Sequence, residues 1–153
     1  MDLILWRHAE AHDLTEGGSD MVRALTARGE KQATRMSVWL DRQLPEGARI
    51  LVSPARRCEQ TAMALERKFK VRPELATGGN VAQLLELAQW PHAKQTVLIV
   101  GHQPTLGQTI ARLLDLTSAD CPVKRGAVWW LRNRVRADQT QTVVVTVQSP
   151  DML

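Results

Sequence analysis

Short apolar runs without alternation are the feature that most constrains how this chain can fold. They are Leu3–Trp6, Ile50–Val52 and residues 97–100, and each is followed by a polar loop and a segment with helical spacing. Strands that are covered by helices on both faces have this continuous hydrophobicity, whereas a strand with one face in water alternates. The sequence therefore predicts an α/β fold: a three-layer α/β/α sandwich with a mostly parallel central sheet.

Start and stop signals indicate where the helices lie. Apolar residues recur at near-helical spacing before Pro45, which predicts a helix over about 27–43. Ser53 and Pro54 read as the N-cap and first position of a second helix, because serine and proline are favoured there. Asn80 is a candidate cap for a third helix, and a fourth opens near Pro104.

The last third of the chain has the pattern of a hairpin. Residues 127–135 and 141–148 read as two strands joined by a polar turn, so we expect a C-terminal antiparallel hairpin. Arg132, Arg134 and Arg136 share one face of the first strand. Interleaved arginine and tryptophan can form a nucleic-acid surface, but an edge strand with its charges facing water is the interpretation that we favour.

Composition limits the function classes. A chain of 153 residues fits a single domain, residues 1–153. Its net charge of +4 is modest and scattered, so it does not by itself indicate nucleic acid. Cys58 and Cys121 have no metal-ligand or disulfide spacing, which favours a reducing compartment. There is no signal-peptide pattern and no run of membrane-spanning length, so we expect a cytoplasmic protein with no membrane partner.

Cationic side chains follow three of the predicted strands. Arg7 and His8 come directly after the first strand, Arg56 and Arg57 lie in the helix after the second, and His102 follows residues 97–100. Because the carboxyl ends of parallel strands meet at one sheet edge, we expect these groups to converge. Their charge-assisted hydrogen bonds, together with nearby helix N-termini, suit a tetrahedral dianion.

The same residues carry a resemblance to a known family. The strand-end Arg-His pair, the run SPARRCEQTA and the run VGHQPTLG together resemble the histidine phosphatase superfamily, also called phosphoglycerate mutase-like. Order, spacing and strand context agree over residues 3 to about 112. Seven residues match its three motifs: Arg7 and His8, then Ser53, Arg57 and Thr61, then Gly101 and His102. With its short length the chain is most similar to the SixA group of small phosphohistidine phosphatases.

One residue departs from the family pattern. The superfamily has glycine after the first histidine, and this chain has Ala9. Alanine is strained only where the backbone needs a positive φ, so we interpret Ala9 as tolerated variation. The segment between residue 70 and the strand at 97 is also too short for the helical cap of larger members, so we expect no cap domain and an open pocket.

The resemblance implies a metal-independent mechanism. His8 would attack phosphorus and become a phosphohistidine that water then hydrolyses, while Arg7, Arg57 and His102 bind the phosphoryl oxygens. No metal and no cofactor is implied. Members that hydrolyse phosphate esters use a carboxylic acid between the second and third motifs, and Glu74 is the candidate for that role here.

The implied substrate is a phosphohistidine on another protein, such as a phosphotransfer domain or a phosphocarrier. A broad-specificity small-molecule phosphomonoesterase is the alternative within the same class. A non-catalytic module that binds phosphate groups or RNA is the alternative from another class. We expect phosphate or sulfate to occupy the pocket and no nucleic-acid partner, and the oligomeric state stays open.

Overall fold

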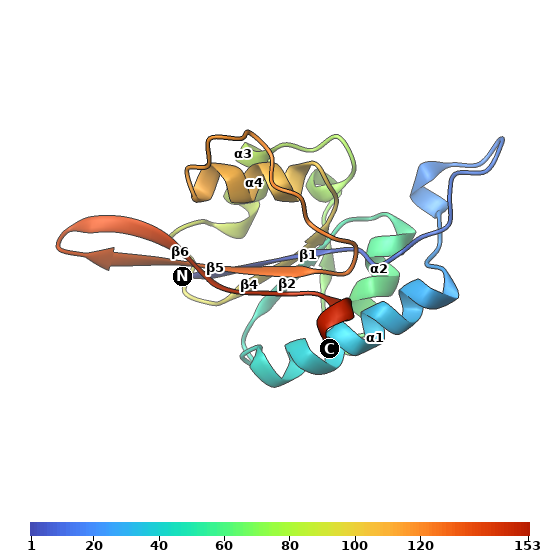
Figure 1. The fold of residues 1–153 in the computed structure, drawn as a ribbon, viewed down its shortest axis with the longest axis horizontal. Coiled ribbons are helices and arrows are strands. Elements are labelled where there is room, and N and C mark those ends of the chain that lie inside the picture. The colour runs from blue at the N-terminus through green and yellow to red at the C-terminus, as the bar shows by residue number, and fades with distance from the viewer.

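A computed structural model describes residues 1–153 and has a six-stranded sheet with helices on both faces (Figure 1). The strands are β1 (Asp2–Arg7), β2 (Arg49–Val52), β3 (Lys70–Val71), β4 (Val97–Gly101), β5 (Val128–Arg136) and β6 (Gln139–Gln148). The helices are α1 (Ala27–Gln43), α2 (Arg56–Met63), α3 (Val81–Ala88) and α4 (Thr105–Leu113). Three short 3₁₀ helices are η1 (Asp20–Val22), η2 (Pro73–Leu75) and η3 (Pro150–Met152).

The sheet has the strand order β3-β2-β4-β1-β5-β6. The first four strands are parallel, and β5 and β6 form an antiparallel hairpin beside β1. The predicted α/β/α fold with a C-terminal hairpin is therefore confirmed. The register between β1 and β4 determines which residues meet at the site, because Arg7 of β1 lies opposite Gly101 of β4. The residues that follow these two strands are consequently neighbours.

Both faces of β1 are covered, which explains its continuous apolar run. Ile4 and Trp6 pack into a cluster with α1 and α2, whereas Leu3 and Leu5 pack into a cluster with α3 and α4. All four side chains have no exposed surface. Burial of such side chains stabilises the fold by roughly 1.5–3 kcal/mol each. Figure 1 shows the two helical layers, α1 and α2 below the sheet and α3 and α4 above it.

Helix α1 packs closely against the loop that follows β1. The predicted bounds of 27–43 are confirmed, and the Thr26 hydroxyl caps the helix by accepting from the Gly29 N–H at 3.0 Å. A Cβ on Gly29 would collide with the carbonyl of Glu10. Glycine therefore lets the first turn of α1 lie against the backbone two residues beyond His8.

The predicted start of the second helix is wrong by two residues. Helix α2 begins at Arg56 with Ala55 in the N-cap position, not at Pro54 after a Ser53 cap. The Ser53 hydroxyl instead accepts from the Ala55 N–H at 3.2 Å and contacts His102, so it shapes the turn and not the helix end. The Asn80 cap of α3 is confirmed, since its side chain accepts from Gln83 N.

The hairpin turns tightly at Ala137 and Asp138, which both have positive φ. Arg132, Arg134 and Arg136 are exposed on β5, as expected. The edge strands of the sheet are β3 and β6, and β5 lies between β1 and β6, so β5 is not the edge strand that we expected. Beyond Arg132, however, β5 pairs with β6 alone. None of the helices is long and apolar enough to cross a membrane.

Candidate active site

The histidines that follow β1 and β4 lie side by side. The ring centroids of His8 and His102 are 5.4 Å apart, with the ring planes tilted by 59°. Both rings are buried, at 7% and 4% exposure. The parallel register explains this convergence, because the N–H of His8 donates to the carbonyl of Gly101 at 3.1 Å.

His8 has one free ring nitrogen. Its Nδ1 lies 2.8 Å from the carbonyl oxygen of Ala9, and a carbonyl can only accept, so Nδ1 carries the hydrogen. The lone pair is therefore on Nε2. Burial lowers the pKa of His8 to about 3, and the charges of His102, Arg57 and Arg7 act in the same direction. The ring is neutral at pH 7, as a nucleophile must be.

His102 is held at both ring nitrogens. Its Nδ1 accepts from Nη2 of Arg57 at 3.3 Å, because a guanidinium can only donate. Its Nε2 then carries the hydrogen and donates to the Ser53 hydroxyl oxygen at 2.7 Å. Burial, reinforced by the charge of Arg57, lowers the pKa of His102 to about 4. This ring is also neutral at pH 7.

Arg57 is buried, with 3% of its surface exposed, and its terminal nitrogens are bonded within the protein. Nη1 donates to the main-chain carbonyl of Asp20 at 2.8 Å, and Nη2 donates to a carboxylate oxygen of Asp20 at 3.0 Å. The Nε atom is buried and has no partner in the protein. Thr61 fixes the start of α2, because its hydroxyl donates to the Arg57 carbonyl at 2.7 Å and accepts from the Ala9 N–H at 3.0 Å.

Arg7 repeats this pattern at the end of β1. Its Nη1 donates to the main-chain carbonyl of Val123 at 2.8 Å, and its Nε is buried without a partner. Buried polar groups are normally hydrogen-bonded, and leaving one unpaired costs about 1–3 kcal/mol. Two such donors, on two cations beside a neutral imidazole, are an arrangement that an anion with several oxygens would satisfy.

Cys58 lies against this cluster but is not a second nucleophile. Its sulfur is 3.5 Å from Nε2 of His102, and the residue is fully buried. Burial raises the pKa of the Cys58 thiol to about 12. The thiol therefore stays protonated at neutral pH, and thiolate chemistry is excluded there.

Residues 3–80 match the model of the histidine phosphatase superfamily (branch 1). The phosphohistidine phosphatase SixA of Escherichia coli strain K12 is 33% identical over 121 residues, which is 74% of each chain.

The chain belongs to the histidine phosphatase superfamily.

Solved structures of superfamily proteins also resemble the whole chain. A structure from Nakamurella multipartitia, described as a phosphohistidine phosphatase SixA, has a TM-score of 0.79 and 31% identity and covers 97% of this chain and 95% of its own. A protein histidine phosphatase SixA complexed with tungstate has a TM-score of 0.77 and 28% identity, with 99% of both chains covered. Tungstate is a tetrahedral oxyanion with the shape of phosphate.

Several residues beside the motifs have a structural explanation. Ala9 is fully buried and is not among the residues with positive φ, so alanine in place of glycine causes no backbone strain. Arg56 is exposed and makes no ion pair, so it is a solvated helix residue and does not join the converging cations. Gln60 and Gln103 form hydrogen bonds with backbone groups. Gln60 accepts from the Leu25 N–H, whereas Gln103 accepts from the Gly107 N–H and donates to the Cys121 carbonyl.

Glu74 is not brought into contact with the other predicted site residues. It lies in η2, and its carboxylate accepts from Arg72 Nη2 at 2.7 Å. A hydrogen bond from its own backbone and the pairing with Arg72 lower the pKa of Glu74. The carboxyl is therefore ionised at neutral pH, which is the wrong form for a general acid.

Sequence reasoning missed two groups that hold the arginines. One is Asp20, the only carboxylate that pairs with Arg7 or Arg57. The other is the carbonyl of Val123, which no side-chain pattern can reveal. The one signal for Asp20 was an acidic residue in the polar loop after the first strand, and such residues are ordinary in loops. No group of three His, Cys, Asp or Glu side chains is placed to hold a metal ion.

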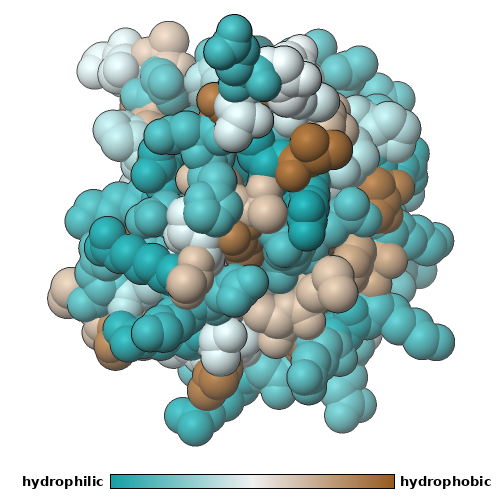
Figure 2. Space-filling model, turned by 90° about the vertical axis from the view of Figure 1, so that its right-hand side faces the viewer, coloured by the Kyte–Doolittle hydropathy of each residue, from teal (hydrophilic) through white to brown (hydrophobic).

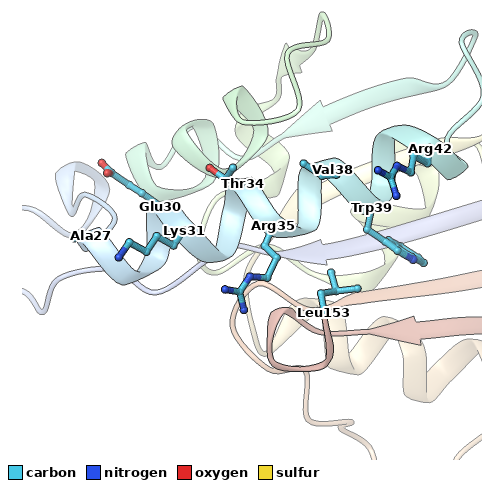
Figure 3. Close-up of a pocket in the computed structure, with 9 residues that line it drawn as sticks. All are labelled: Ala27, Glu30, Lys31, Thr34, Arg35, Val38, Trp39, Arg42 and Leu153. Carbon is cyan, nitrogen blue, oxygen red and sulfur yellow. The ribbon is translucent and has the colours of Figure 1, made fainter.

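The side of the molecule where strands β1, β2 and β4 reach their carboxyl ends faces the viewer in Figure 2. Its surface is mainly hydrophilic, and the apolar residues are scattered. A separate hollow of about 750 Å³ lies between α1 and the C-terminal segment (Figure 3). Lys31, Arg35, Trp39 and Leu153 are among the residues that line it, and none of the predicted site residues does.

Proposed function

We propose that this protein is a metal-independent phosphatase that removes phosphate from a histidine of another protein through a covalent intermediate on His8. One observation carries the proposal. His8 is neutral with Nε2 free, beside two arginines whose buried Nε donors have no partner. A phosphoryl group supplies the electrophile that the imidazole needs and the oxygens that the arginines lack.

The reaction has two displacements at phosphorus. In the first, the His8 Nε2 lone pair forms a bond to phosphorus while the bond to the leaving nitrogen breaks. In the second, water forms the new P–O bond, the P–Nε2 bond breaks, and inorganic phosphate leaves with His8 restored. Arg7 and Arg57 stabilise the charge on the phosphoryl oxygens in both steps, which is the main catalytic contribution expected for phosphoryl transfer. His102, whose ring nitrogens are bonded to Arg57 and Ser53, orients the Arg57 guanidinium.

The pairing of Glu74 with Arg72 favours a P–N substrate. An alkoxide leaving group gains about 10²–10⁴-fold from protonation by an enzyme acid. Glu74 is ionised and paired with Arg72, so it does not fill this role. An imidazole leaves from phosphohistidine far more easily than an alkoxide from an ester, so it needs less help. The names of the SixA relatives support the same assignment.

The lack of a helical cap suits a substrate on a folded protein. Between β3 and β4 the chain forms only η2 and the eight-residue helix α3, so there is no helical cap domain. A phosphohistidine that projects from a phosphotransfer domain or phosphocarrier can then reach His8. Cys58 and Cys121 are both free thiols, which supports the proposal that the protein acts in the reducing cytoplasm.

The test compares substrates and variants. Wild type, His8→Ala and the control His12→Ala are incubated with a phosphohistidine-bearing protein and with a small alkyl phosphate ester. We expect wild type and His12→Ala to prefer the phosphohistidine by at least about tenfold in kcat/KM, since only the ester needs an acid. We expect His8→Ala to release no phosphate and to accumulate no acid-labile phosphoryl label.

Two outcomes would contradict the proposal and select an alternative. Phosphate release by wild type at the rate of His8→Ala would identify a non-catalytic binding module. A clear preference for the ester would identify a small-molecule phosphomonoesterase.

A further inference from the structure

Asp20 holds the guanidinium of Arg57 in one orientation, and we propose that it is a positioning residue for phosphoryl transfer. It acts through Arg57 and does not itself contact the phosphoryl group. The proposal rests on the proposed function for its catalytic consequence, but its effect on anion binding can be measured without turnover.

Two hydrogen bonds join Asp20 and Arg57. Asp20 accepts from both terminal nitrogens of Arg57, with its main-chain oxygen at 2.8 Å and its carboxylate at 3.0 Å. An arginine side chain has about 2 kcal/mol of rotamer entropy, so a guanidinium without such contacts samples several orientations. Here the contacts hold the guanidinium, and its buried Nε has no partner in the protein. That donor is then directed to one place.

The loop that carries Asp20 is itself anchored. The His12 N–H donates to the Ala24 carbonyl at 2.9 Å, and the Leu25 N–H donates to Gln60 of α2 at 2.7 Å, which close the base of the loop. Arg23 donates to the second carboxylate oxygen of Asp20 at 3.0 Å and to the His12 carbonyl at 2.7 Å. Asp20 is therefore fixed at both carboxylate oxygens, although its side chain is 40% exposed.

These contacts form a continuous chain into the site. Arg23 bonds Asp20, Asp20 bonds Arg57, Arg57 bonds Nδ1 of His102, and His102 bonds the Ser53 hydroxyl. Loss of the Asp20 carboxylate would free one end of this chain. The guanidinium and the adjacent ring would then lose their common orientation, and misplacement of about 1 Å can cost about 10²-fold in rate.

A purely electrostatic role for Asp20 predicts the opposite effect on binding. Its carboxylate is negative, because the hydrogen bond from Arg23 and the pairing with Arg57 lower its pKa. Removal of this charge raises the positive potential at the pocket, which by Coulomb attraction alone would tighten the binding of an anion. A positioning role predicts weaker anion binding, because the N–H donors of Arg57 then lose their fixed direction toward the anion. The sign of the change in anion affinity therefore distinguishes an electrostatic role from a positioning role.

The experiment uses Asp20→Ala and Asp20→Asn, with Asp41→Ala as the matched control. Asp41 likewise accepts from an arginine, Arg67 Nε at 2.9 Å, but it lies at the end of α1 away from the site. Calorimetry measures tungstate binding, and steady-state kinetics measure turnover of a phosphohistidine protein. We expect Asp20→Ala to weaken tungstate binding at least about fivefold and to lower kcat about 10–100-fold.

The asparagine variant distinguishes a positioning role of Asp20 from a role in the stability of its loop. Asparagine keeps a carbonyl oxygen that can accept from Nη2, so Asp20→Asn should recover most of the loss, whereas Asp41→Ala should match wild type. Tighter tungstate binding by Asp20→Ala, equal losses in the alanine and asparagine variants, or unchanged kinetics would overturn the proposal. A wild type that binds tungstate but hydrolyses nothing would contradict the proposed function alone, and the binding series would still decide the role of Asp20.

Discussion

The Ser53 hydroxyl lies 2.7 Å from Nε2 of His102 and joins the ends of the neighbouring parallel strands β2 and β4. Both residues are buried, so water does not compete for this bond. Arg57 sets the tautomer of His102, because a guanidinium can only donate to Nδ1, and the Nε2–H then donates to the Ser53 hydroxyl oxygen. A residue of the second superfamily motif thereby orients a residue of the third.

Ser53→Ala should impair both stability and activity. The substitution leaves the buried Nε2–H of His102 without a partner, which costs about 1–3 kcal/mol in the free energy of unfolding. The ring is then free to turn, and we expect kcat to fall about tenfold, within the range for a mispositioned group. Chemical denaturation and phosphatase kinetics measure the two effects.

Ser37→Ala is the control for loss of a buried hydroxyl. Ser37 is buried in α1 and donates to the Thr34 carbonyl at 2.7 Å, far from the site. We expect its kinetics to equal those of wild type. Equal kinetics for Ser53→Ala and Ser37→Ala would contradict an orienting role for Ser53.

The two site histidines should titrate far below the usual range. Burial lowers the pKa of His8 to about 3 and that of His102 to about 4, from an ordinary value of 6.5. The unfolded chain then binds more protons than the folded chain in this window, so the free energy of unfolding falls as the pH drops from 6.5 toward 4. Histidine NMR titration of the ligand-free protein, assigned with His8→Ala, measures both midpoints. Midpoints near 6.5 would contradict the prediction that burial keeps the rings neutral.

Gly29→Ala should disturb the loop beside the nucleophile. A Cβ at Gly29 would meet the backbone of Glu10, which cannot move aside as a flexible side chain could. We expect a loss of about 1–3 kcal/mol in the free energy of unfolding, typical of an overpacked site, and reduced phosphatase activity. Thermal unfolding and kinetics test this.

Gly47→Ala is the matched glycine control. Gly47 has negative φ and open space where its Cβ would lie, so we expect little change in stability or activity. If both variants unfolded at the same temperature with equal activity, close packing of α1 on the loop would not be required.

Glu74→Gln should leave turnover of phosphohistidine unchanged within about twofold, because an ionised carboxylate paired with Arg72 does not donate a proton. The kinetic comparison is made on a phosphohistidine protein and on a small alkyl phosphate ester, whose alkoxide leaving group needs a proton. A loss larger than tenfold on the ester would restore Glu74 as the acid for that substrate.

Local patterns predicted most of the fold. The apolar runs predicted β1, β2 and β4. Helical spacing predicted α1, and the Asn80 cap predicted α3. The start of α2 was misplaced because the Ser53 hydroxyl bonds His102, which is 49 residues away. No local rule for helix caps includes such a distant partner. The pairing of Glu74 with Arg72 was equally invisible, since it depends on how η2 turns.

The sequence by itself determined which strands are covered on both faces and which cationic residues stand at their carboxyl ends. These properties follow from hydrophobic periodicity and from the chirality of parallel β-α units. Only the tertiary structure decided that Asp20 holds Arg57, 37 residues away, that the arginine Nε donors stay unpaired, and that His8 is neutral with Nε2 free. Hydrogen-bond partners and pKa values depend on burial and on distances between remote segments, and those exist only once the chain is folded.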